Sequence, residues 1–190
     1  MVKIILISGK AGSGKTFLAN HLKSYIEEAY GKKGYVINFG DALKMVATQI
    51  YNWDGEKDET GRELLQRVGT DIAQKNNNMV WVNIVIQIIK AFRSEYDFVI
   101  IGDIRFRHEI YSIYDYSVDQ SSCQQSDSVY HINIIGPENN LSNRAKCHPS
   151  EEEVDMIKDY NCDYLFHNEH YNIYRFFHQI SEIVSNVIGL

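Results

Sequence analysis

The residues with the clearest chemical potential form one octet near the start of the chain. The phosphate-binding pattern GxxxxGK followed by Ser or Thr is matched at every specified position by Gly9, Lys10, Ala11, Gly12, Ser13, Gly14, Lys15 and Thr16. Glycines let the backbone close on a phosphate, and successive N–H groups point at the anion. We expect Lys15 to reach the terminal phosphates of a nucleotide and the Thr16 hydroxyl to bind Mg²⁺. The alternative is a glycine-rich turn without a ligand.

Asp103 and Arg105 form a second group. Asp103 follows the apolar run 98–102, and an Asp at the tip of a buried strand is the Walker B partner expected of such a loop, where it holds Mg²⁺ directly or through water. Arg105 places a guanidinium at the same edge of the predicted sheet. It either binds an anion there or pairs with Asp103 or Glu109.

Asp41 and Lys44 come directly after another predicted strand, 35–39. Ligands of open α/β sheets bind outside the carboxyl ends of the strands, so both side chains are candidates for binding a ligand. Asp41 also has a structural alternative, because an Asp at the start of a helix can cap its first turn.

Arg62 stands in the first turn of a helix predicted to begin with Thr60 as its cap, since Glu63 follows at the spacing of a capping box. A cation in the first turn opposes the helix dipole by roughly 0.3–1 kcal/mol. The sequence offers Arg62 no obvious local partner, which favours an external anion.

Short apolar runs alternate with helical patterns through most of the chain and would position these groups. Strands are predicted at 4–7, 35–39, 98–103, 129–135 and 163–167, and helices at 17–29, 43–50, 60–72, 79–92, from 149 onward, and 173–188. No element is assigned to 106–116, and the Ser-, Gln- and Asp-rich stretch 117–128 is predicted to be a surface loop. The polar segment 136–150 is either a mobile lid over phosphates or an ordinary solvated loop.

The composition is that of one globular domain over residues 1–190, because 190 residues with 44% hydrophobic content can bury one core but hardly two. The net charge of −6 argues against a polymeric nucleic-acid partner. No apolar run approaches ~18 residues, so no membrane span is expected. Three cysteines without a CxxC pair or an export signal favour a reduced, cytoplasmic setting. A homodimer is left open.

The motifs together resemble the phage-type deoxynucleoside monophosphate kinases and, more loosely, metabolite kinases such as phosphomevalonate and dephospho-coenzyme A kinases. The matching stretches are GKAGSGKT at 9–16, GDALK at 40–44, GRELLQRVGTDIA at 61–73, WVN at 81–83, GDIRF at 102–106, HPSE at 148–151, and Asn168. The resemblance covers nearly the whole chain. It implies an α/β, three-layer P-loop kinase fold with a five-stranded, mostly parallel sheet, helices on both faces and a small lid. It is also compatible with a phage- or virus-encoded protein acting in the host cytoplasm.

The resemblance further implies transfer of the ATP γ-phosphate to a deoxynucleoside monophosphate, with small nucleotides as substrates. ATP would bind at Gly9 to Thr16 and Asn168, and Mg²⁺ at Thr16 and Asp103. Residues implied in phosphoryl transfer are Lys15, Arg62, Asp103, Arg105 and Arg144. The resemblance implies an acceptor-binding region at about 40–80. Residues implied in acceptor binding are Asp41, Lys44, Arg62, Gln66, Trp81, Arg105, His148 and Glu151. Trp81 by itself would be assigned to the core of its apolar helix.

The chain departs from the family's pattern at three places. Gln74 stands where an Arg is common, Arg107 and His108 replace a Pro-Asn pair, and Gly136 stands where an Arg follows the fourth strand. The candidates to supply the missing charge are Lys75, Arg144 and Lys146.

Two other functions fit parts of the sequence. A kinase of a different phosphorylated or hydroxylated metabolite would use the same donor loop. A nucleotide-dependent switch or assembly ATPase is the alternative from another class. Its support is weak, because the DxxG match at 58–61 follows no apolar strand and no NKxD motif occurs.

Overall fold

The computed structural model describes residues 2–119, 127–136, 153–154, 156–157, 162–169 and 172–188. Five parallel strands form one sheet in the order β2-β3-β1-β4-β5. The elements along the chain are β1 (Lys3–Ser8), α1 (Lys15–Tyr30), β2 (Gly34–Ile37), α2 (Phe39–Tyr51), α3 (Glu59–Gln66), the π-helix η1 (Arg67–Gln74), α4 (Val80–Phe92), β3 (Phe98–Ile104), α5 (Arg107–Asp119), β4 (Ser128–Ile135), β5 (Tyr164–His167) and α8 (Ile173–Ile188). All five predicted strands are present.

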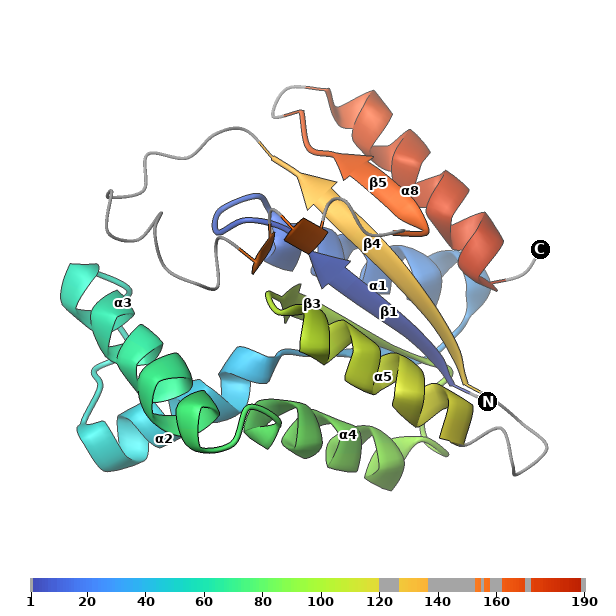
Figure 1. Ribbon diagram of the computed structural model, residues 1–190. Helices are drawn as coiled ribbons and strands as arrows, with labels where there is room; N and C mark the ends of the chain where they lie inside the picture. Colours follow the sequence, from blue (N-terminus) through green and yellow to red (C-terminus); the bar gives the residue numbers. More distant parts are fainter. Residues whose placement is uncertain are drawn as a thin grey trace.

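Alternate residues of the central strands enter two separate cores. Ile4 and Leu6 of β1 pack on the side of α4 and α5, whereas Ile5 and Ile7 pack on the side of α1 and α8 (Figure 1). All four side chains are fully buried, which is why this strand reads as a continuous apolar run rather than an alternating one. The sheet with helices on both faces confirms the predicted three-layer α/β fold.

Helix α5 is the element that the sequence analysis missed. Its Ile110, Ile113 and Tyr116 are buried on the α4 side of the sheet. These few apolar positions stand among polar and aromatic neighbours, so the helical period is weak and only the sheet underneath selects the helix. The loop predicted from residue 117 is wrong as far as Asp119, where α5 ends. Residues 120–126 lie outside the described part of the chain.

The start of α3 also differs from the prediction. The cap is Asp58, whose Oδ1 accepts the N–H of Gly61 at 2.7 Å, rather than Thr60. Gly61 lies so close to the preceding loop that a Cβ would be 2.1 Å from the carbonyl oxygen of Glu56. With this close approach, α3 is capped two residues earlier than the capping-box spacing predicts.

Helices α2, α3 and η1 lie together beside the carboxyl edge of the sheet (Figure 1). After Gln66 the predicted single helix continues as η1, a π-helix, which widens the backbone spiral at this point. The carbonyl of Gly69 within η1 accepts the indole N–H of Trp81 from α4 at 3.1 Å. The three helices are thereby tied to the layer that covers the sheet.

The structure contains, over its described residues, no helix with the length and apolar character that crossing a membrane requires.

Gly34 on the edge strand β2 gives the first testable prediction. It lies opposite Phe98 of β3, and a Cβ at residue 34 would come within 2.2 Å of the Phe98 ring, which is fully buried. We expect Gly34→Ala to lower the free energy of unfolding by about 1–3 kcal/mol through overpacking, measured by urea denaturation. In a Phe98→Leu background the same change should cost at most about half as much. An equal cost in both backgrounds would contradict the packing explanation.

Candidate functional site

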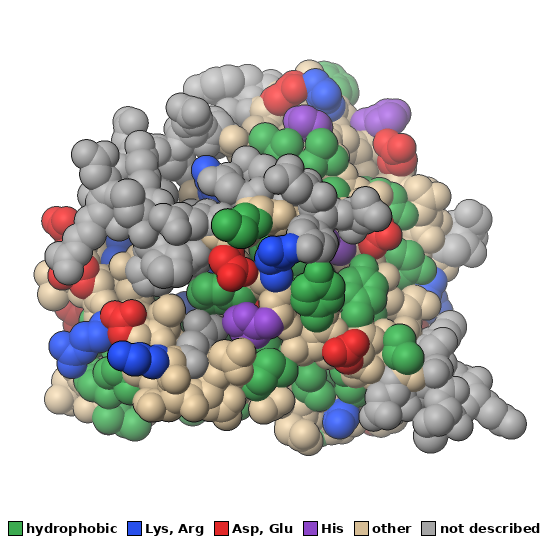
Figure 2. Space-filling view, viewed as in Figure 1, with side chains coloured by type: hydrophobic (Ala, Val, Ile, Leu, Met, Phe, Trp, Pro, Cys, Tyr) green, Lys and Arg blue, Asp and Glu red, His purple; other side chains and the backbone are tan. Residues whose placement is uncertain are grey.

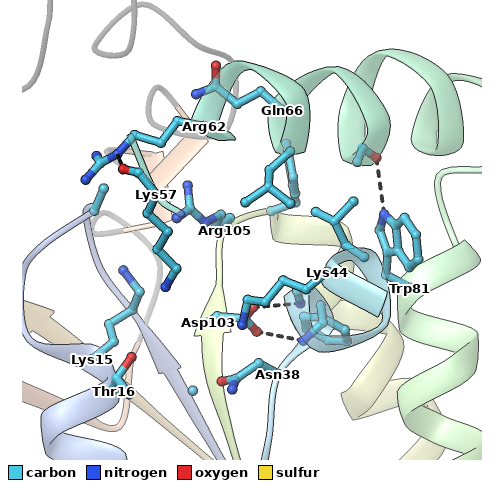
Figure 3. A pocket seen from close by; sticks show the side chains of 18 of the residues that line it. Lys15, Thr16, Asn38, Lys44, Lys57, Arg62, Gln66, Trp81, Asp103 and Arg105 are labelled. Carbon is cyan, nitrogen blue, oxygen red and sulfur yellow. Dashed lines mark hydrogen bonds between the residues drawn. The ribbon is translucent and has the colours of Figure 1, made fainter. Parts of the chain in front are cut away.

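One cavity of about 610 Å³ opens at the carboxyl edge of the sheet. The octet after β1 and the start of α1 form one wall, and the start of α2, the loop before α3, α3 and η1 form the opposite wall (Figure 3). The tip of β3, with Asp103 and Arg105, lies between them. This is the edge of the sheet at which the sequence predicted a ligand.

The octet adopts a backbone that only glycine readily permits. Gly9 has φ 150° and Gly14 has φ 99°, and a Cβ at Gly14 would lie 2.5 Å from Nδ2 of Asn168. Helix α1 begins at Lys15 without a side-chain cap, so its first N–H groups face the loop. The Lys15 ammonium folds back on the loop and donates to the carbonyls of Gly9 and Lys10 at 2.5 and 2.7 Å. This is a cradle shaped for a phosphate.

The cradle is supported from β4 and β5. Nδ2 of Asn168, directly after β5, donates to the carbonyl of Ser13 at 2.9 Å. Gly136, directly after β4, lies so close that a Cβ would be 2.6 Å from Cα of Ser13. Oγ of Ser13 is buried and has no hydrogen-bond partner within the described structure. Asn168 thus holds the loop's shape, while Ser13 is not among the described residues that line the cavity.

Asp103 joins β3 to the start of α2. Its Oδ1 accepts the N–H of Phe39 and its Oδ2 the N–H of Gly40, both at 2.8 Å. Burial raises the pKa of Asp103, and the two N–H donors and the nearby charge of Arg105 oppose that shift. Each oxygen keeps a lone pair for a cation or its water, and Thr16 lines the same cavity. The pair fits Mg²⁺, which binds few protein oxygens and keeps waters and phosphates as its other ligands.

Asp41 stabilises the first turn of α2, although not as the cap that the sequence offered as its structural alternative. It is the third residue of α2 and accepts the backbone N–H of Asn38, while the cap residue of α2 is Asn38 itself. Asp41 also forms an ion pair with Lys44 at 2.8 Å. Lys44 and Asn38 line the cavity, whereas Asp41 is not among the lining residues.

Several other predicted residues meet in the cavity. Arg62, Gln66 and Arg105 line it together with Trp81. Trp81 is only 6% exposed, and its N–H is already bonded to Gly69, so its indole serves as an apolar wall. Nε of Arg62 donates to the carbonyl of Lys57 at 2.9 Å. The predicted Arg144, Lys146, His148 and Glu151 lie outside the described residues, as does the side chain of Gln74.

Lys57 lines the cavity although the sequence analysis gave it no role, and so does Glu109, which the sequence offered only as an alternative partner for Arg105. Oε2 of Glu109 accepts the N–H groups of Arg105 and Phe106 at 2.8 and 2.9 Å, which fixes the backbone of Arg105. Glu109 is 3% exposed, and burial raises its pKa to about 8. The missed helix α5 carries Glu109, and Lys57 stands in a polar loop, so neither had a periodic signal.

A phosphate cradle between a strand and a helix, a carboxylate at the tip of a neighbouring strand and cations across the cavity define a P-loop kinase. The family described as deoxynucleotide monophosphate kinase matches residues 16–119, more than half of the 190 residues. The chain belongs to this family and is an ATP-dependent nucleotide kinase. No curated protein matches the chain.

Solved structures of kinases share the fold at low identity. The Mycobacterium tuberculosis APS kinase CysC, in complex with AMPPNP and APS, has a TM-score of 0.51 and 12% identity, over 100% of this chain and 98% of that one. Chaetomium thermophilum Kti12 with ADP-AlF3 has a TM-score of 0.51 and 14% identity, over 98% and 100%. A sugar kinase from Janibacter sp., unliganded, has a TM-score of 0.51 and 11% identity, over 97% and 94%. At these identities the likeness concerns the fold.

Glu109 gives a prediction about pH. Because its pKa is about 8 in the folded protein and ordinarily 4.5, the folded state holds an extra proton between these values. The stability that it contributes is complete below about pH 4.5 and is lost as pH rises through 8. Glu109→Gln keeps an acceptor for Arg105 and Phe106 without the proton. We expect the wild type to lose roughly 2 kcal/mol more than the variant between pH 6.5 and 8 in urea denaturation. Parallel pH profiles would refute this assignment.

Proposed function

We propose that the protein transfers the γ-phosphate of ATP to a deoxynucleoside monophosphate, giving ADP and a deoxynucleoside diphosphate. The observation that carries the proposal is that one cavity joins the phosphate cradle to a second wall bearing cations and apolar side chains. A simple hydrolase needs only the cradle, whereas a kinase needs room for an acceptor. Membership of the family makes a nucleoside monophosphate the acceptor of choice.

The cradle wall would hold the donor. Backbone N–H groups of the octet and the first turn of α1 would bind the phosphates, and Lys15 would exchange its bonds to Gly9 and Lys10 for the terminal phosphates. Thr16 and Asp103 would hold Mg²⁺, which would supply positive charge to neutralise the phosphates. AMPPNP bound to the Mycobacterium APS kinase, which shares this fold, supports a nucleotide in this position.

The opposite wall would hold the acceptor. The cavity is lined by Arg62 and Arg105 and by the apolar side chains of Leu43, Leu65 and Trp81. In Figure 3, Arg62 and Arg105 lie nearer to Lys15 than Trp81 does. A monophosphate would face the cations and its base would lie among the apolar side chains. Gln66 lies at the rim, and its amide would offer a donor and an acceptor to a base edge.

Catalysis would rest on alignment and charge neutralisation. The acceptor phosphate already carries an anionic oxygen, so no general base is required, and Asp41 remains with its helix. Lys15, Arg62 and Arg105 would stabilise the charge spread over the transferred group. Because the substrates are small nucleotides of the cell's pool, a cytoplasmic location is part of the proposal.

The proposal is tested by an assay of ADP release across the deoxy- and ribonucleoside monophosphates. We expect at least one deoxynucleoside monophosphate to stimulate ADP formation and to appear as the diphosphate. If only another phosphorylated metabolite stimulates ADP formation, that metabolite is the acceptor, and the proposed substrate is wrong. Slow hydrolysis that depends on a protein partner, without transfer, would favour a switch and contradict the proposal.

Lys15 provides the mutational prediction. Lys15→Ala removes the side-chain cation that donates to the loop carbonyls of Gly9 and Lys10, so we expect kcat to fall by at least about 10²-fold. Circular dichroism and thermal unfolding should show that the fold is retained. Lys32→Met is the control, because Lys32 pairs with Asp97 on the surface at 3.5 Å, and it should keep wild-type turnover. Near-normal turnover of Lys15→Ala would remove the assigned donor site.

A further inference from the structure

Lys57 is a cavity residue to which the family and the sequence motifs assign no role. It stands between α2 and α3 and lines the cavity. Figure 3 shows its side chain extending from the acceptor wall into the cavity, with its amine directed toward Lys15 and with Arg105 beside it. Lys57 therefore spans the space between the two walls.

The loop that carries Lys57 is fixed by contacts on both sides. Before it, the indole N–H of Trp53, which is 8% exposed, donates to the carbonyl of Glu56 at 2.9 Å. After it, Asp58 caps α3 through the N–H of Gly61. The carbonyl of Lys57 itself accepts Nε of Arg62. These bonds hold the backbone of Lys57 at the cavity, while the residue itself is exposed.

The charge around Lys57 is unbalanced. No carboxylate of the described residues forms an ion pair with Lys57. Both carboxylates that line the cavity, Asp103 and Glu109, already accept two backbone N–H groups each. On the outer face in Figure 2, by contrast, the described basic and acidic side chains are mixed. The chain as a whole carries a net charge of −6, so cations that converge in one cavity favour an anion there.

We propose that Lys57 binds the phosphate of the acceptor on the side opposite Lys15, so that the transferred group passes between the two ammonium groups. This inference rests on the proposed kinase reaction. The acceptor side follows from the position of Lys57 on the wall of α2 and α3, whereas backbone N–H groups of the cradle serve the donor. A lysine suits this place, because its flexible stem can follow a phosphoryl group as it moves.

The test compares Lys57→Met with Lys57→Arg, and Lys32→Met serves again as the control. We expect Lys57→Met to weaken the binding of a deoxynucleoside monophosphate by about 10–100-fold, the effect of losing one charge-assisted hydrogen bond. Lys57→Arg should recover most of that loss. Binding of AMPPNP with Mg²⁺ should stay within about twofold of the wild type. Calorimetric titration gives both affinities, and steady-state kinetics should show a raised KM for the acceptor with an unchanged KM for ATP.

The outcomes separate this inference from the proposed function. Active wild type with unchanged acceptor affinity in Lys57→Met overturns the role of Lys57 and leaves the kinase reaction intact. Loss of AMPPNP affinity with normal acceptor affinity overturns the acceptor-side assignment. Wild type that phosphorylates no nucleoside monophosphate overturns the proposed function. In that case the affinity of the AMPPNP complex for inorganic phosphate is measured. Equal phosphate affinity in wild type and Lys57→Met rejects Lys57 as an anion-binding residue.

Discussion

The paired hydrogen bonds from Phe39 and Gly40 to Asp103 are the constraint on which the cavity depends. They tie the first turn of α2 to the tip of β3, with one N–H for each carboxylate oxygen at 2.8 Å. Burial makes this carboxylate costly, as its raised pKa indicates, but the N–H donors and the positive end of α2 compensate. With α2 held at the sheet edge, α3 and η1 follow as the wall that faces the phosphate cradle. Asp103 therefore shapes the site before it meets any metal.

The cradle is anchored in the same manner from the other half of the sheet. Asn168 after β5 holds the carbonyl of Ser13, and Gly136 after β4 leaves the loop room to approach. The wall of α2, α3 and η1 is thus held at β2 and β3, whereas the cradle is supported from β4 and β5. Because the sheet is rigid and fully buried at its centre, the distance between donor and acceptor walls is a property of the fold. Such alignment is what phosphoryl transfer requires of a protein.

One kind of contact recurs in the site. Charged side chains form hydrogen bonds with backbone groups, and these bonds are present before a ligand binds. Glu109 holds the N–H groups of Arg105 and Phe106, Arg62 holds the carbonyl of Lys57, and Lys15 holds carbonyls of its own loop. The cations that face the cavity are thereby positioned through main-chain contacts, which lose less entropy on binding than mobile side chains would. An anion then enters a cavity whose positive charge is already arranged.

The amino-acid sequence by itself determined the octet, the buried strands, the strand-tip Asp103 and the fold class, because these depend on local spacing and continuous apolar runs. It did not determine α5, whose three buried apolar positions give too weak a period, or the Asp58 cap, which depends on the contact between Gly61 and Glu56. It also left Asp41 between ligand binding and capping, and the structure shows that Asn38 is the cap, while Asp41 accepts the N–H of Asn38 and pairs with Lys44. Lys57 and Glu109 became visible as site residues only in the tertiary structure, because folding brings a polar loop and a missed helix to one cavity. Motifs made of neighbouring residues can be recognised in the sequence, whereas contacts between distant side chains depend on how the helices pack on the sheet.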